Sequence, residues 1–449
     1  MPSDVIPNRR DSPSTASRRA FLKGAAALAM TSRMARAEES RASFARSGQV
    51  SPDAAVAVAS ASPARAQRRT GPPAIGATLA YVGSYSSPEG PEGSKGNGEG
   101  IYLFEMDAST GALRQREVFR NGMNPSWIAF NPARTHLYSA NETHEYNGTA
   151  SGSISAYAIE RSTGRLRLLN TVSSEGAGPA HMSIHPSGKY ALVANYAGGT
   201  IAVIAIGPSG ELGAATYVHH DRGAVGATRA TSAPPGSFAV SGHHSPHAHM
   251  IHSDPSGRYV LSTDLGMDKI FVWKFDARKG TLAPHQSVSL PTGDGPRHFA
   301  FHPNGRWVYS AQEEASTLTF FEYGGASGRL TKRSAVPTLP KGFAGTNFAS
   351  EVRVPADGRF VYVGNRLHDS TAFFSIGADG TPKLAGEAWT RGDYPRSFNF
   401  DPTGDFLYSC NQRADAVTTF RVNRATGELT FAGQYTPVGT PSCIIFLAA

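Results

Sequence analysis

Hydrophobic positions along the chain recur in short alternating runs that are bounded by proline or glycine. One unit repeats: a proline, a run that alternates apolar and polar residues, a second proline, and an apolar run that often contains tyrosine. Two copies begin at Pro125–Pro132 and Pro179–Pro186. Alternation with a period of two indicates β-strands with one buried face. The pattern therefore predicts two strands per copy, joined by a proline-containing turn.

The spacing of these copies sets the size of the repeating unit. The second proline of each copy is Pro132, Pro186, Pro255, Pro303, Pro355 and Pro402, with steps of 54, 69, 48, 52 and 47 residues. Ala248 replaces the first proline in one copy, Asn347–Pro355 is degenerate, and the longest step contains an insertion from His219 to His244. Each step fits one four-stranded blade of a β-propeller.

The two ends of the chain carry complementary halves of the same unit. Ala80–Gly83 has the second-strand pattern without a first strand, and Pro441–Phe446 has the first-strand pattern without a second. Pairing these segments would complete a seventh blade and leave no exposed sheet edge. The predicted fold class is therefore all-β, a seven-bladed β-propeller over residues 78–449 whose N- and C-terminal strands close the ring. A row of separate β-sandwiches is the alternative, but it leaves the half-units unexplained.

The N-terminal region has the pattern of an export signal. Ser17–Lys23 contains Arg18 and Arg19, an apolar run follows at 24–30, and Ala35-Arg36-Ala37 offers a cleavage site. This order is typical of twin-arginine (Tat) signals, and the run is too short to span a bilayer. We predict a signal peptide at 1–37, a disordered linker at 38–77, the Tat export machinery as a partner, and a periplasmic or secreted protein.

Charge and cysteine content exclude some classes of protein. The formal net charge is +8, of which five charges lie in residues 1–37 and two in 38–76, so the predicted propeller carries only +1. A nearly neutral body argues against nucleic acid as a partner, and we expect a monomer without a membrane span. Cys410 and Cys443 are expected to be unpaired buried thiols, although a single disulfide remains open.

Two sets of equivalent positions gather polar side chains. The first strands of a propeller line its channel, so equivalent residues form rings near one mouth. The position six residues before each second proline holds Ser126, Ala180, His249, Arg297, Ala349 and Arg396, with Ser442 in the closing strand. The position after each second strand holds Tyr85, Glu142, Tyr196, Leu265, Glu313, Arg366 and Gln412. Each residue alone is as well explained by structural hydrogen bonds or ion pairs, but together they indicate a polar site.

Histidines are frequent around the insertion and raise the question of a metal. They are His219, His220, His243, His244, His247, His249 and His252. They lack a carboxylate or cysteine partner at a recognisable ligand spacing. We therefore expect no metal site and no cofactor.

Several stretches resemble the signature motifs of the seven-bladed lactonase family. They are Ser245-Pro246-His247-Ala248-His249, Gly295-Pro296-Arg297-His298, Glu313 and Gly364-Asn365-Arg366-Leu367-His368-Asp369-Ser370. The resemblance spans about residues 78–449, and the family includes 6-phosphogluconolactonases and carboxymuconate-cyclising enzymes. It implies that His249, Arg297, Glu313 and Arg366 are catalytic. We take His247, His298, His368, Glu142 and Arg396 as candidate substrate-binding residues.

The resemblance implies a lactone hydrolase of 6-phosphogluconolactonase type that acts on a sugar lactone or an acidic lactone in carbohydrate metabolism. Hydrolysis needs a base for the attacking water and a group that stabilises the oxyanion. Glu313 or His249 is the candidate base, and Arg297 with Arg366 would hold an anionic group or the oxyanion. Two alternatives stay open: a carboxymuconate-type lactonising cyclase that uses the same cations, and a non-catalytic propeller that binds a protein or glycan.

Overall fold

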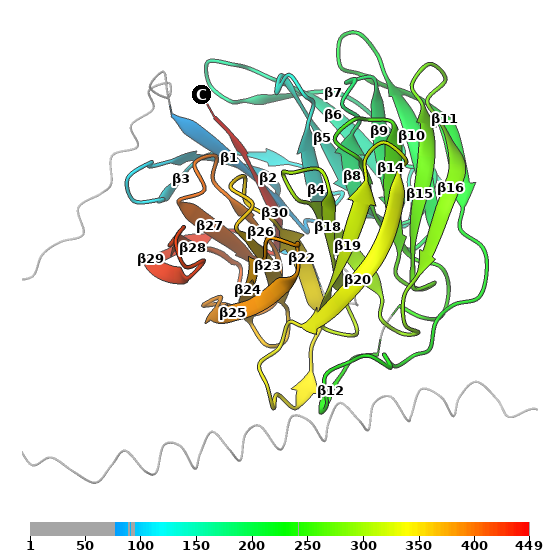
Figure 1. Cartoon of the computed structure of the whole chain (residues 1–449). Coiled ribbons are helices and arrows are strands. Elements are labelled where there is room, and N and C mark those ends of the chain that lie inside the picture. The colour runs from blue at the N-terminus through cyan, green and yellow to red at the C-terminus, as the bar shows by residue number, and fades with distance from the viewer. Residues whose placement is uncertain (1–76, 89, 91–94, 241, 449) are drawn as a thin grey trace, which may run out of the picture. The chain divides into compact units, whose positions relative to one another are not determined.

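The computed structural model describes residues 77–88, 90, 95–240 and 242–448. These residues form a seven-bladed β-propeller without helices, so the predicted fold class is confirmed (Figure 1). The signal peptide predicted at 1–37 and the linker predicted at 38–77 lie outside the described residues, apart from residue 77. The described part of the chain offers no helix with the length and hydrophobicity that a membrane crossing requires.

Each blade is a four-stranded antiparallel sheet, and the strand bounds follow the repeat. The first three blades are β30 (Pro441–Leu447), β1 (Thr78–Ser84), β2 (Gly100–Met106) and β3 (Leu113–Arg120); β4 (Pro125–Phe130), β5 (His136–Asn141), β6 (Ser153–Ile159) and β7 (Leu166–Ser173); and β8 (Pro179–Ile184), β9 (Tyr190–Asn195), β10 (Thr200–Ile206) and β11 (Leu212–His220). The next two are β13 (Ala248–Ser253), β14 (Tyr259–Asp264), β15 (Lys269–Asp276) and β16 (Thr281–Ser289); and β17 (Pro296–Phe301), β18 (Trp307–Gln312), β19 (Thr317–Gly324) and β20 (Arg329–Pro337). The last two are β22 (Ala349–Arg353), β23 (Phe360–Asn365), β24 (Ser370–Ile376) and β25 (Pro382–Trp389); and β26 (Pro395–Phe400), β27 (Phe406–Asn411), β28 (Ala416–Val422) and β29 (Leu429–Pro437).

The ring closes as the half-units predict. Strand β30 pairs antiparallel with β1, and the register places Ile444 opposite Val82 (Figure 1). Both side chains are buried, and Cys443 beside them is buried as well. Cys443 and Cys410 are free thiols, as expected. The last strand of the chain therefore completes the hydrophobic core of the first blade.

The repeated tyrosine of the second strand ties each blade to the next. Tyr81 donates a hydrogen bond of 2.7 Å to the carbonyl of Gly164, which lies in a turn of the following blade. Tyr138, Tyr309, Tyr362 and Tyr408 donate in the same way to Gly210, Gly380, Gly427 and Gly111. These turn glycines have positive φ, for example 75° at Gly164, a conformation that other residues adopt at a cost. The tyrosine and the glycine of the repeat are thus two halves of one contact between blades.

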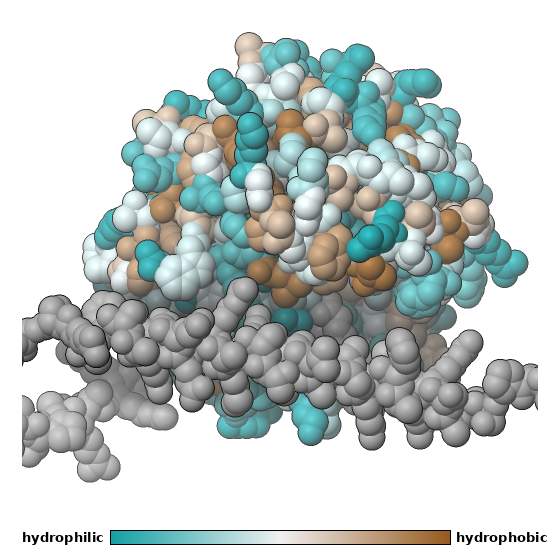
Figure 2. All heavy atoms as spheres, turned by 90° about the horizontal axis from the view of Figure 1, so that it is seen from below, coloured by the Kyte–Doolittle hydropathy of each residue, from teal (hydrophilic) through white to brown (hydrophobic). Residues whose placement is uncertain are grey.

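Exposure follows from the order of strands in a blade. The three inner strands are mostly buried between neighbouring blades, whereas the outer strands alternate exposed and half-buried residues. On the face shown in Figure 2, hydrophobic and hydrophilic residues are interspersed. The large exposed hydrophobic residues are Leu168, Val225, Phe238, Val240, Leu384, Trp389 and Tyr435. Val225, Phe238 and Val240 lie in the insertion and Leu384 and Trp389 lie on β25, whereas Leu168 and Tyr435 are single residues on β7 and β29.

The long insertion crosses several blades near the channel mouth. It begins after His220, because His219 and His220 belong to β11 and not to a loop as expected. The backbone N–H of Gly226 donates to the carbonyl of Gly266, and that of Thr231 donates to Thr292. Its short strand β12 (Ser237–Phe238) pairs in parallel with β21 (Gly345–Thr346), which lies in the connection between β20 and β22. These bonds anchor the loop to three connections between strands.

Candidate active site

The innermost strand of every blade carries a β-bulge directly after its first residues. In β4 the register shifts between Pro125 and Trp127, and the same shift recurs in β8, β13, β17, β22, β26 and β30. A bulge inserts one unpaired residue and changes the direction of its side chain. Except in β22, the bulge residues are the ring predicted six residues before each second proline. The regular strand stops at this point, and polar side chains can turn toward the channel.

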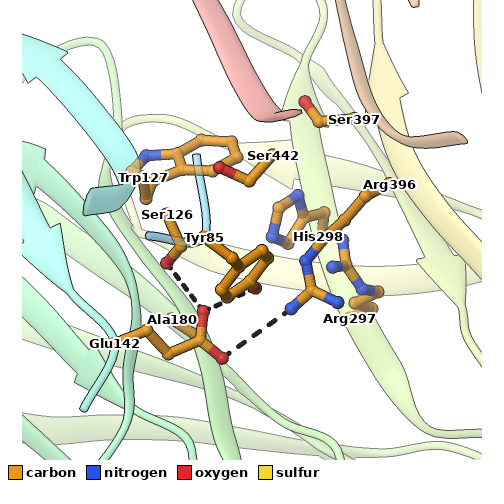
Figure 3. Close-up of a pocket in the computed structure, with 10 residues that line it drawn as sticks. All are labelled: Tyr85, Ser126, Trp127, Glu142, Ala180, Arg297, His298, Arg396, Ser397 and Ser442. Carbon is orange, nitrogen blue, oxygen red and sulfur yellow. Dashed lines mark hydrogen bonds and ion pairs between the residues drawn. The ribbon is translucent and has the colours of Figure 1, made fainter. Parts of the chain in front are cut away.

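Five residues of that ring line a narrow cavity of about 10 Å³ in the channel (Figure 3). The full lining is Tyr85, Ser126, Trp127, Glu142, Ala180, Arg297, His298, Arg396, Ser397 and Ser442. Tyr85 and Glu142 come from the second predicted ring, so the structure brings both rings together. Two arginines and one glutamate are the charged groups of this lining.

One blade departs from the predicted ring by one residue. In β22, Ala349 lies opposite Asn365, the place that Pro296 takes opposite Gln312 in β17. Ser350, and not Ala349, is therefore the equivalent of Arg297. The reason is that the degenerate copy has one residue fewer between its bulge and Pro355. The shift also makes Glu351 the equivalent of His298.

Three of the four residues with implied catalytic roles contact one another. Oε2 of Glu313 lies 2.9 Å from Nε of Arg297 and 2.7 Å from Nη2 of Arg366. All three side chains are buried, and burial together with the charge of Arg366 lowers the pKa of Arg297 to about 10. Arg297 thus stays cationic at neutral pH. Its Nη1 is buried and has no hydrogen-bond partner among the described residues.

His249 is the fourth of these residues and lies beside the same cations. Its ring packs edge-on against His298, with 5.0 Å between ring centroids, and against Tyr196. Burial, followed by the charge of Arg297, holds the pKa of His249 well below its ordinary value. The imidazole is therefore neutral at neutral pH, and its buried Nδ1 has no hydrogen-bond partner in the described part of the chain.

Glu142 and Arg396 form the other charged side of the cavity. Oε2 of Glu142 accepts hydrogen bonds from the hydroxyls of Tyr85 at 2.7 Å and Ser126 at 2.6 Å (Figure 3). Its Oε1 lies 3.8 Å from Nη2 of Arg396, whose guanidinium also stacks over the ring of Tyr85. Burial raises the pKa of Tyr85 well above its ordinary value, so its hydroxyl remains a donor. Both candidate substrate-binding residues therefore face the cavity.

Of the remaining candidate substrate-binding residues, one lines the cavity and two do not. His298 lines the cavity and contacts Glu351. Nδ1 of His247 lies 2.8 Å from the carbonyl oxygen of Tyr196, and its ring stacks on that tyrosine, so it supports the loop and does not line the cavity. His368 contacts Ser370 and Phe343, also away from the lining. His247 precedes the bulge of β13, and His368 lies in the turn between β23 and β24, so neither occupies a bulge position that faces the channel.

Sequence reasoning missed several residues of the site. Trp127 and Ser397 line the cavity, and Glu351 lies behind His298. A signal for Glu351 was present: it is a carboxylate in a strand whose equivalents in other copies are mostly apolar or histidine. The equivalence of Glu351 to His298 was concealed because this copy is one residue shorter before Pro355.

Among the described residues, no group of three or more histidine, cysteine, aspartate or glutamate side chains is arranged to hold a metal ion. The histidines in and before the insertion contact other partners: His243 lies 3.1 Å from Asp268, and His219 on β11 lies 3.5 Å from Asp221.

The fold and the cavity define a seven-bladed propeller with a cationic site at its axis. The chain belongs to the family described as "Lactonase, 7-bladed beta-propeller", which it matches over residues 79–446. The 6-phosphogluconolactonase of Bacillus subtilis (strain 168) is 32% identical over 370 residues, which cover 82% of this chain and 98% of that protein.

Solved structures of similar proteins agree over the same region. The periplasmic gluconolactonase of Pseudomonas aeruginosa matches with a TM-score of 0.72 at 28% identity, over 83% of this chain and 99% of that chain. A protein from Lactobacillus plantarum matches with a TM-score of 0.71, also at 28% identity, over 83% and 99% of the two chains. A protein of Staphylococcus aureus (strain USA300) described as uncharacterized is 30% identical over 374 residues, 82% of this chain and 100% of that protein.

Proposed function

We propose that this protein hydrolyses a sugar lactone or an acidic lactone, and that it does so outside the cytoplasm after export by the twin-arginine route. The observation that carries the proposal is Arg297. It is buried, it lines the cavity, and its Nη1 lacks a hydrogen-bond partner among the described residues. A buried guanidinium donor without a partner is costly, and an oxygen of the substrate would satisfy it.

The geometry suits the charge that develops during hydrolysis. When water attacks the lactone carbonyl, its oxygen becomes an oxyanion, and a fixed cation in a dry site stabilises that charge strongly. Arg297 is held by Glu313, which Arg366 also contacts, so the guanidinium is positioned before the substrate arrives. Arg396 on the other side of the cavity can bind a hydroxyl or an anionic group of the sugar. Glu142 can accept hydrogen bonds from sugar hydroxyls.

Two observations support a site of action outside the cytoplasm. Phosphorylated sugar lactones arise in the cytoplasm, whereas Ser17–Lys23 has the twin-arginine pattern. A relative at 28% identity is a periplasmic gluconolactonase. We therefore propose an unphosphorylated aldonolactone or an acidic lactone as the physiological substrate.

The test is the rate of ring opening by the full chain with gluconolactone, 6-phosphogluconolactone and a carboxymuconate as substrates. We expect faster opening of gluconolactone than in buffer, and a loss of about 10²–10³-fold in kcat for Arg297→Gln, the size of effect seen when one oxyanion donor is removed. Arg333→Gln is the matched control, because Arg333 forms an exposed pair with Glu322. Absence of acceleration with both lactones would refute the proposal, and turnover of carboxymuconate alone would favour the cyclase.

A further inference from the structure

His298 has a partner that no other histidine beside the cavity has. It lies on β17, is 1% exposed and lines the cavity (Figure 3). Its Nδ1 is 3.2 Å from Oε1 of Glu351, a buried carboxylate on β22. Nε2, the other ring nitrogen, is buried and has no hydrogen-bond partner among the residues that the structure describes.

Glu351 is itself held in place from several sides. The hydroxyl of Ser397 donates to Oε2 at 3.0 Å, and the backbone N–H of Val352 donates to Oε1 at 3.2 Å. Nε of Arg353 lies 3.4 Å from Oε1. An ionised carboxylate can only accept hydrogen bonds, so Nδ1 of His298 carries the proton and Nε2 carries the lone pair.

We propose that His298 is the catalytic base of the cavity and that Glu351 is a positioning residue, which fixes the ring and its tautomer through Nδ1. The inference rests on the proposed lactone hydrolysis and specifies which group moves the proton. A carboxylate that orients an imidazole, whose other nitrogen is free to take a proton, is the arrangement by which hydrolases activate a nucleophile.

The protonation states at neutral pH support this role. Burial alone would raise the pKa of the Glu351 carboxyl, but the charge of Arg353 and the contact with His298 outweigh burial and lower this pKa to about 2. Burial is the main cause that lowers the pKa of His298 to about 4, although Glu351 opposes the shift. Glu351 is therefore ionised and His298 neutral. A low pKa also makes the protonated imidazole a strong acid toward a departing alkoxide.

The other candidate bases are placed less well. Nδ1 of His249 has no hydrogen-bond partner in the described part of the chain, so nothing fixes the tautomer of that ring through this atom. Oε2 of Glu313 is engaged by Arg297 and Arg366. Oε2 of Glu142 accepts from two hydroxyls, which occupy one of its oxygens.

The proton balance of the reaction is complete with His298 alone. Nε2 takes a proton from water as the water oxygen bonds to the carbonyl carbon, and the carbonyl oxygen becomes an oxyanion beside Arg297. When the carbonyl re-forms, the bond from that carbon to the ring oxygen breaks. The departing alkoxide takes the proton from Nε2, which returns the imidazole to its neutral form. The product is an open-chain hydroxy acid that releases its carboxyl proton to solvent.

The experiment compares kcat and KM of the full chain on gluconolactone for variants of His298, Glu351 and His249 and for one control variant. His298→Asn retains an amide that can still donate to Glu351, and we expect kcat to fall about 10²–10⁴-fold with little change in KM. Glu351→Gln keeps the volume and removes the charge, and we expect a fall of about 10–100-fold. His185→Asn is the matched control, because His185 is buried but lies outside the cavity lining, where its Nε2 is 2.8 Å from the carbonyl oxygen of Gly257.

A pH profile separates proton transfer from a structural role. The titratable or charged groups around His298 are Arg297 on β17, His249 on β13, His181 on β8, and Glu351 and Arg353 on β22. The wild-type kcat should fall as pH drops toward 4, where His298 gains a proton. In Glu351→Gln this fall of kcat should occur at lower pH, because the negative charge of Glu351, which favours the protonated imidazole, is gone.

The outcomes distinguish the two proposals. A wild-type chain without activity overturns the proposed function and this inference with it. An active wild type whose kcat survives in His298→Asn, or whose kcat collapses only in His249→Asn, overturns the assignment of the base alone. If His298→Asn does not fold, as shown by loss of the wild-type thermal transition, Glu351→Gln tests the assignment of the base. An unchanged kcat in Glu351→Gln, with an unchanged fall of kcat at low pH, would also overturn that assignment.

Discussion

Removing strand β30 is expected to unfold the propeller, because this strand supplies the inner wall of the first blade. It pairs with β1 from Leu79 to Ser84 and buries Cys443, Ile444 and Phe446 at 2%, 1% and 7% exposure. Each such side chain contributes about 1.5–3 kcal/mol, so the deletion removes about 5–9 kcal/mol before hydrogen bonds are counted. The total stability of a domain is only about 5–15 kcal/mol.

The assay is thermal and urea unfolding of a chain that lacks residues 440–449. We expect the cooperative transition to disappear or to move far below that of the wild type. A graded variant keeps the test quantitative: Ile444→Ala should lower the free energy of unfolding by about 2–5 kcal/mol. Leu168→Ala, at a residue that is 54% exposed, should change it by less than about 0.5 kcal/mol. A truncated chain with the wild-type melting temperature and urea midpoint would refute the closure argument.

Three further predictions concern export, pH and the thiols. Changing Arg18 and Arg19 to lysine should stop export of a reporter fused to residues 1–45, whereas the same change at Arg9 and Arg10 should not; continued export of the first variant would contradict the signal. Burial and the nearby Asp264 raise the pKa of Asp221 from 3.8 to about 9, so the folded state binds the extra proton and stability falls as pH rises between these values. The melting temperature of Asp221→Asn should therefore be closer to that of the wild type at pH 5 than at pH 8, and at pH 8 the variant should be the more stable. Equal differences in melting temperature at both pH values would argue against the raised pKa of Asp221. Burial raises the pKa of Cys443 to about 12, so iodoacetamide should label neither cysteine until urea unfolds the chain, and rapid labelling of the native protein would contradict their burial.

The sequence determined the architecture of this protein because the repeat is a local property of the chain. Alternation fixes which residues of a strand face inward, the prolines mark its start and the following turn, and Gly164 and its equivalents mark the outer hairpins. The half-units at Ala80–Gly83 and Pro441–Phe446 fixed the number of blades and the closure, because an unpaired sheet edge is unfavourable. Equivalent positions in the copies also identified Arg297, Arg396 and Glu142 as neighbours.

Only the tertiary structure decided which of these side chains face one another. The bulges that turn Ser126 and its equivalents inward have no distinct residue pattern, since they follow from how a strand pairs with its neighbour. The contact of His298 with Glu351 depends on a shift of one residue in β22, which counting back from Pro355 conceals. His247 and His368 lie in the same signature stretches as His249 and Arg366, yet His247 precedes the bulge of β13 and His368 lies in the turn between β23 and β24, so both contact other partners. The fold and the residues that form the two rings can thus be predicted from the sequence. The pairing of charges across the channel depends on the register of strands that are far apart in sequence.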